Sequence, residues 1–171
     1  IYTTIDSRMQ EYAEEAVEMH LANLQKEVFK QQKGNKNAPC IQINQSETKK
    51  IIDRAMRNSE RWRQMSAQGK EEVDIVKSFD VKTKMAIFTW KGEKDTLMTP
   101  RDSIVYYKHF LQSGMMSMEP VTGNVKAWVG GIDYKHFQYD HVAQGARQVG
   151  STFKPFVYAT AIDQLGMSPC D

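Results

Sequence analysis

The chain has 171 residues, of which 40% are hydrophobic and 26% are charged. This composition is typical of a folded domain with a buried core, and it excludes a disordered or a membrane-embedded chain. The net charge is +2, and the 21 acidic residues leave no basic face among the 23 basic ones. Nucleic acid is therefore not an expected partner.

The cysteines and histidines predict neither a disulfide framework nor a metal site. Cys40 lies in a predicted loop and Cys170 beside the end of the sequence, so only their number is compatible with a bridge. The four histidines have no spacing typical of metal ligands. We expect no metal and no organic cofactor.

The first half of the chain predicts helices separated by a loop. Apolar residues recur at helical spacing from Met9 to Val28, after Asp6 or Ser7 as the N-cap. Residues 30–45 lack this periodicity and predict a loop. A second helix is expected from Ser46 to Gly69, and one or two further helical turns over 71–79.

The second half predicts short strands and two more helices. Residues 84–90 alternate as a strand does, with 96–98 as the partner strand. Thr99 and Pro100 begin a helix that should run to Gly114. Residues 115–118 and 125–129 predict a hairpin, and 132–146 an aromatic loop. The sequence thus indicates an α+β fold.

The candidate catalytic pair is Ser151 and Lys154, which stand three residues apart where a final helix begins. A serine hydroxyl needs a base to become a good nucleophile, and a lysine amine is a base only while it is neutral. Phe153 and Phe156 could supply the dry surroundings that favour a neutral amine. The backbone N–H of Ser151 could stabilise an oxyanion.

Spacing alone leaves a plain N-cap as an equal alternative for Ser151. Ser46 and Lys49 have the same Ser-x-x-Lys spacing, and there we interpret Ser46 as an ordinary N-cap because no glycine or apolar wall accompanies it. Pro155 is tolerated only inside the first turn of a helix, which gives the second Ser-x-x-Lys a more defined shape.

Three segments resemble class A penicillin-binding proteins, and they occur in the order found in that family. Ser-x-x-Lys is a signature of these proteins. The similar segments are 147–158 (RQVGSTFKPFVY) at the active serine, 118–131 (MEPVTGNVKAWVGG) at the opening hairpin of the transpeptidase domain, and 2–10 (YTTIDSRMQ) in the link from the glycosyltransferase domain.

The chain departs from the family pattern in two ways, and the second indicates that it is a fragment. Val149 stands where many members carry proline, and neither Ser-x-Asn nor Lys-Thr-Gly nor Lys-Ser-Gly is present. The resemblance implies a helical and small-sheet linker or pedestal over 1–114. Residues 115–171 would then be the first hairpin and the active-serine helix of an incomplete transpeptidase domain.

The resemblance also implies a function. The parent would be a bifunctional peptidoglycan synthase on the periplasmic face of the bacterial inner membrane, with Ser151 as nucleophile, Lys154 as base and the Ser151 N–H as oxyanion donor. Gly150, Tyr139 and His141 would line the cleft, although plain packing is an equal explanation for the two rings. No metal or cofactor is implied.

The implied partners are peptidoglycan stem peptides, β-lactams and other envelope or cell-wall synthesis proteins. We expect the fragment to be soluble and inactive by itself, and to pair with a second copy through the exposed serine helix. The alternative is a non-catalytic envelope interaction or scaffolding module in which Ser151 only caps a helix.

Overall fold

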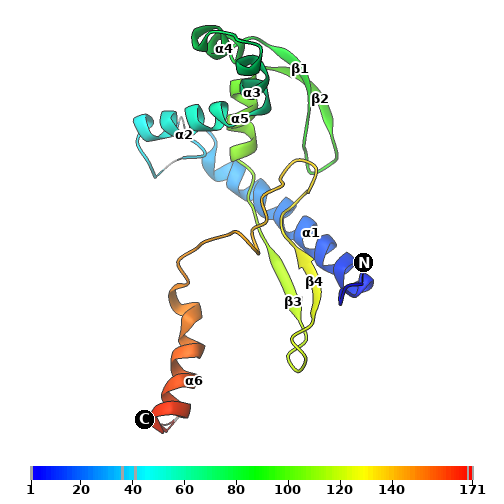
Figure 1. The fold of residues 1–171 in the computed structure, drawn as a ribbon, viewed down its shortest axis with the longest axis vertical. Helices are drawn as coiled ribbons and strands as arrows, with labels where there is room; N and C mark the ends of the chain where they lie inside the picture. Colours follow the sequence, from blue (N-terminus) through cyan, green and yellow to red (C-terminus); the bar gives the residue numbers. More distant parts are fainter. Residues whose placement is uncertain (1, 36, 41, 169, 171) are drawn as a thin grey trace.

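The structure is a computed structural model that describes residues 2–35, 37–40, 42–168 and 170. Its helices and small antiparallel sheets give the α+β class that the sequence predicts (Figure 1). The elements in chain order are α1 (Ser7–Gln32), α2 (Gln45–Arg57), α3 (Glu60–Ala67), α4 (Glu72–Ser78), β1 (Thr83–Ile87), β2 (Lys94–Met98), α5 (Pro100–Lys108), β3 (Met115–Met118), β4 (Val125–Val129), the 3₁₀ helix η1 (Gly150–Phe153) and α6 (Lys154–Leu165).

The long helix α1 runs through the middle of the molecule (Figure 1). It begins at Asp6, whose carboxylate accepts hydrogen bonds from the backbone N–H groups of Arg8 at 3.0 Å and Met9 at 3.2 Å. Asp6 rather than Ser7 is therefore the N-cap. Figure 1 shows α2 to α5 and the β1–β2 hairpin gathered at one end of α1, with the β3–β4 hairpin beside its other half.

The β3–β4 hairpin packs against the first half of α1. Ala13 of α1 is buried against Ala127 and Val129 of β4, because small side chains let the helix approach the strand. The side chain of Gln10 makes two hydrogen bonds with the backbone of Trp128, accepting from its N–H at 2.7 Å and donating to its carbonyl at 3.0 Å. The free edge of β4 is thereby occupied.

A second core lies among the shorter helices. Met56 of α2, Ile75 of α4 and Phe79 bury almost all of their surface against one another. The β1–β2 hairpin leaves this region with Thr83 opposite Met98 and Ile87 opposite Lys94. The sequence predicted this strand pair, but β1 ends at Ile87 instead of Trp90 and β2 begins at Lys94 instead of Thr96.

The buried side chain of Gln25 ties α1 to the end of α5. Gln25 is 1% exposed, and its amide nitrogen donates to the His109 carbonyl at 2.9 Å. Its amide oxygen accepts from the Leu111 N–H at 2.8 Å. Gln25 thus takes the place of a backbone partner for the carbonyl and the N–H that follow α5.

Three expected boundaries differ from the structure. The single helix expected over 46–69 is broken into α2 and α3, because Ser59 caps a new helix by accepting from the Trp62 N–H at 3.3 Å. α5 ends at Lys108 instead of Gly114, since the following backbone bonds to Gln25. The first helix continues to Gln32, beyond the expected start of the loop.

Ser46 is not the N-cap that we predicted. Asn44 caps α2, and its side-chain oxygen accepts from the Glu47 N–H at 2.9 Å. Asn is as good a cap as Ser, so the helix starts two residues earlier than the sequence interpretation placed it. The Ser46 to Lys49 pair still lies in an ordinary helical first turn.

Replacing Gln25→Leu should destabilise the protein, because it leaves a carbonyl and an N–H unpaired. We expect the unfolding free energy to fall by about 1–3 kcal/mol for each orphaned group. Urea unfolding followed by circular dichroism measures the change. Gln31→Leu is the control, since Gln31 is exposed on the same helix and should change the free energy by less than about 0.5 kcal/mol. Equal effects from the two variants would contradict the role of Gln25.

Candidate functional site

The Ser151 segment begins at Gly150, whose backbone conformation favours glycine. Gly150 has φ of +52°, and a Cβ there would meet no atom within 4 Å. Its requirement is therefore conformational rather than steric. The hydroxyl of Thr152 then donates to the Val149 carbonyl, which holds the single 3₁₀ turn of η1.

Ser151 and Lys154 lie in consecutive helical turns. Ser151 is the second residue of η1 and Lys154 the first of α6, and the Lys154 N–H donates to the Ser151 carbonyl. Pro155 sits in the first turn of α6, as its chemistry demands. The sequence predicted one helix starting at Ser151, whereas the structure has a 3₁₀ turn before the α-helix.

Ser151 does not cap either helix. The N-cap positions are Val149 for η1 and Phe153 for α6, and neither helix start has a side-chain cap hydrogen bond. The Ser151 side chain is exposed. The interpretation of Ser151 as a plain N-cap, on which the scaffolding alternative depended, does not match this geometry.

The dry surroundings expected for Lys154 are not formed by the described chain. Lys154 is exposed. The rings of Phe153 and Phe156 contact each other, with centroids 5.6 Å apart, but remain 52% and 66% exposed. Any dehydration of this amine therefore has to come from a surface that covers α6.

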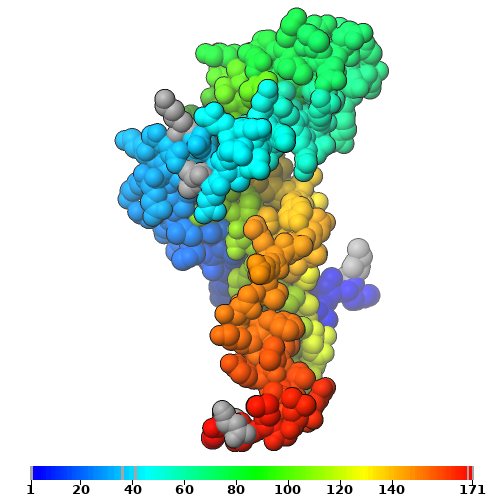
Figure 2. Space-filling model, turned by 90° about the vertical axis from the view of Figure 1, so that its left-hand side faces the viewer, coloured from blue at the N-terminus to red at the C-terminus, as the bar shows by residue number. Residues whose placement is uncertain are grey.

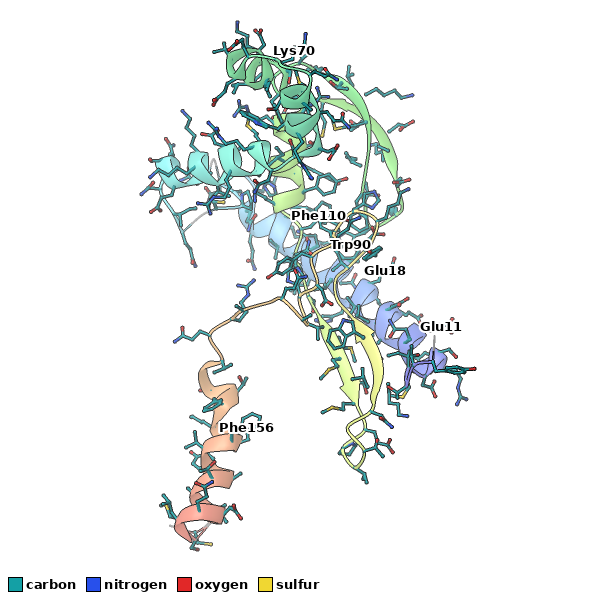
Figure 3. All side chains as sticks on the ribbon, viewed as in Figure 1. Glu11, Glu18, Lys70, Trp90, Phe110 and Phe156 are labelled. Carbon is teal, nitrogen blue, oxygen red and sulfur yellow. The ribbon has the colours of Figure 1, made fainter. Side chains whose placement is uncertain are left out.

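Helix α6 presents apolar side chains to solvent (Figures 2 and 3). Figure 2 shows this orange-to-red helix projecting at one end of the molecule, and Figure 3 shows Phe156 directed away from the ribbon. Apolar residues on one side, with Thr160, form an open groove of about 390 Å³ whose walls are Phe153, Phe156, Val157, Ala161 and Leu165. Its exposed apolar surface is typical of a contact face.

The loop that follows β4 holds Tyr139 and His141. Their rings meet edge to face, with centroids 4.8 Å apart, and the Tyr139 hydroxyl donates to the Gln144 carbonyl at 2.6 Å. Tyr139 also lines a cavity of about 510 Å³ beside Glu14 and Trp128. Among the described residues, no hydrogen bond or ring contact joins these two side chains to Ser151. The structure thus brings Tyr139 and His141 together but places neither on the serine.

Asp140 anchors this loop, a role that no sequence pattern predicts. Its carboxylate accepts from the indole N–H of Trp128 at 3.0 Å and from the backbone N–H groups of Val142 at 2.9 Å and Ala143 at 3.0 Å. The bond from Ala143 is the main cause of a lowered pKa of Asp140; partial burial opposes it, and the bonds from Trp128 and Val142 add to the lowering.

The described ranges show no group of three or more His, Cys, Asp or Glu that could hold a metal ion. Cys40 and Cys170 are both free thiols. None of the helices seen in the described part of the chain is both long and apolar enough to cross a bilayer.

Comparison with known proteins finds similarity to one family. Residues 35–111 match the model of the penicillin-binding protein middle domain. Penicillin-binding protein 1A of Neisseria flavescens is 39% identical over 72 residues, which is 42% of this chain and 8% of that protein. These matches support a relationship to the class A penicillin-binding proteins.

Further relatives support the same family. Penicillin-binding protein 1A of Neisseria gonorrhoeae is 42% identical over 60 residues, covering 35% of this chain and 8% of that protein. The protein of that name from Pseudomonas aeruginosa is 40% identical over 52 residues, covering 30% of this chain and 6% of its own length. The chain therefore matches less than a tenth of the length of each of these relatives. No solved structure matches it significantly.

Acid should release the loop that Asp140 anchors. Because the folded carboxyl has a lowered pKa, its contribution is present above the unfolded value of about 3.9 and is lost as pH falls through the folded value. The indole N–H signal of Trp128 in NMR spectra should move during acid titration, and Asp140→Asn should abolish that movement. The Trp62 indole is the control, since it packs on Phe79 and no hydrogen bond from its N–H to a carboxylate is found among the described residues. A Trp128 signal that titrates equally in both proteins would contradict this role.

Proposed function

We propose that this chain carries the nucleophile of a D-Ala-D-Ala transpeptidase that cross-links peptidoglycan in the bacterial envelope. Residues 1–114 would form the linker or pedestal, and 115–171 the start of the transpeptidase domain. The observation that carries this proposal is the pair Ser151 and Lys154 in consecutive turns, which follows the β3–β4 hairpin and the matched middle domain.

The reaction would proceed by acyl transfer. The hydroxyl of Ser151 attacks the carbonyl of the penultimate D-Ala in a stem peptide, and its proton passes to the Lys154 amine. The tetrahedral oxyanion is stabilised by the Ser151 N–H, and collapse expels the terminal D-Ala after protonation. An amine of a neighbouring strand then attacks the ester and regenerates the serine. β-Lactams would acylate the same oxygen.

The geometry of the serine supports this role. Ser151 is exposed and is not used as a helix cap, so its hydroxyl is available to a substrate. It lies in the first turn of η1, where backbone N–H groups have no acceptor within the helix. Gly150 leaves its own surroundings open, since apart from its two chain neighbours no residue has an atom within 4 Å of the position of an added Cβ.

The remaining parts of the site have to cover α6. Phe156, Val157 and Leu165 are 66%, 52% and 73% exposed, and a folded transpeptidase domain would bury them. The second oxyanion donor and a substrate-binding strand are also needed. We therefore propose that the chain alone is inactive and that its function belongs to a larger protein at the inner membrane, with envelope proteins as further partners.

Labelling with a fluorescent penicillin tests the proposal. A form of the protein that also carries Ser-x-Asn and Lys-Thr-Gly segments should be labelled stoichiometrically, and Ser151→Ala should reduce labelling by about 10³-fold or more because the nucleophile is lost. The matched control is Ser46→Ala in the other Ser-x-x-Lys pair, which should be labelled normally. The 171-residue chain should remain unlabelled. Labelling that survives Ser151→Ala would exclude the proposed nucleophile.

The exposed face of α6 should also make the chain self-associate. Light scattering is expected to show a mass that rises with concentration, because two copies can bury their apolar grooves together. Phe156→Glu should shift the protein to monomer. Val73→Glu is the control, since Val73 is 63% exposed on α4, away from α6. A monomer at every concentration, with an ordered α6, would contradict this expectation.

A further inference from the structure

The tip of the β1–β2 hairpin is bonded to the loop that follows β4. The carboxylate of Glu93, just before β2, lies 2.9 Å from Nε2 of His136 and 2.9 Å from the amine of Lys135. Glu93 belongs to the segment that matches the middle domain, whereas His136 lies beyond the β3–β4 hairpin. One carboxylate therefore connects two separate parts of the chain.

The imidazole of His136 is enclosed by aromatic rings. Its side chain is only 11% exposed. It stacks on Tyr107 of α5 with an interplanar angle of 17° and contacts Phe88 at 5.5 Å between centroids. Phe88 also packs against Phe137 of the loop at 5.4 Å. Figure 3 shows two further rings of this region, Trp90 and Phe110, beside α1.

The second ring nitrogen of His136, Nδ1, also contacts a carboxylate. Nδ1 lies 2.7 Å from the Asp133 carboxylate, which also accepts from the His136 N–H at 2.8 Å. Ionised carboxylates only accept hydrogen bonds, so both contacts are hydrogen bonds at the same time only when each ring nitrogen carries a proton.

Charged groups on several elements face this ring. They are Glu93 beside β2, Asp133 and Lys135 of the loop, and Glu18 of α1, which lines the same cavity of about 280 Å³. The hydrogen bond from Lys135 is the main cause of a lowered pKa of Glu93, with a smaller contribution from His136. The same pair raises the pKa of Lys135. Glu93 is therefore ionised at neutral pH and able to accept hydrogen bonds from Lys135 and His136.

We propose that Glu93 and His136 form a latch that positions the loop 130–146, and hence the chain entering the Ser151 segment, against the β1–β2 hairpin. The term latch means the Glu93–His136–Asp133 contact. Glu93 is 42% exposed at a turn, so its loss removes little packing while it frees the loop. The position of the loop is measured without substrate. The test of the latch is therefore independent of whether Ser151 is a nucleophile.

Hydrogen–deuterium exchange of the native 171-residue chain tests the latch. Glu93→Ala should make amides of 130–146 exchange roughly tenfold faster, as expected when a charged hydrogen bond is lost, while α1 amides stay unchanged. Glu93→Gln keeps an acceptor oxygen and should give an intermediate rate. Asp95→Ala is the matched control, since Asp95 pairs at 3.7 Å with Lys84 inside the same hairpin.

Two more variants separate the latch from its neighbours. Lys135→Ala removes the other cation on Glu93 and should leave loop exchange close to native, whereas His136→Gln should raise it as Glu93→Ala does. NMR at pH 6 should show slowly exchanging protons on both ring nitrogens of His136, and only one of them after Glu93→Ala. The exposed His20 should show neither. Native loop exchange in Glu93→Ala, or a larger effect from Lys135→Ala than from His136→Gln, would overturn the proposal.

Discussion

The fold depends on side-chain amides of α1 that stand in for backbone partners. Gln25 satisfies a carbonyl and an N–H at the end of α5, and Gln10 does the same for Trp128 in β4. An amide can donate and accept at once, which makes it the side chain best suited to replace a strand or a helix neighbour. The 26-residue helix α1 therefore holds the end of α5 and strand β4 at a set separation.

This arrangement fixes the β3–β4 hairpin on α1 but does not extend to η1 and α6. The β3–β4 hairpin is fixed on α1 through Ala13 and Gln10, and Asp140 then fixes the first part of the next loop to Trp128. Beyond that loop, η1 and α6 extend without a comparable core (Figure 2). The nucleophile that we propose thus sits where the chain's own packing ends, and an apolar helix in water favours association with a further surface.

The aromatic cluster around Phe88 joins parts of the chain that a family comparison would divide. Residues 35–111 match the middle domain, yet Phe137 and His136 from beyond that range complete the packing of its aromatic side chains. In a penicillin-binding protein such a contact would let the middle domain influence the approach to the serine. The latch gives that influence a defined chemical basis in charge and hydrogen bonding.

The sequence by itself determined the local features: the α+β class, the cap at Thr99 and the hairpin of β3 and β4. These depend on residues within a few positions of each other. Only the tertiary structure decided where α5 ends, which aspartate anchors the loop, and that Ser151 is no cap. The partners of Gln25 lie 84 and 86 residues away and that of Glu93 lies 43 residues away, so no local pattern could reveal them.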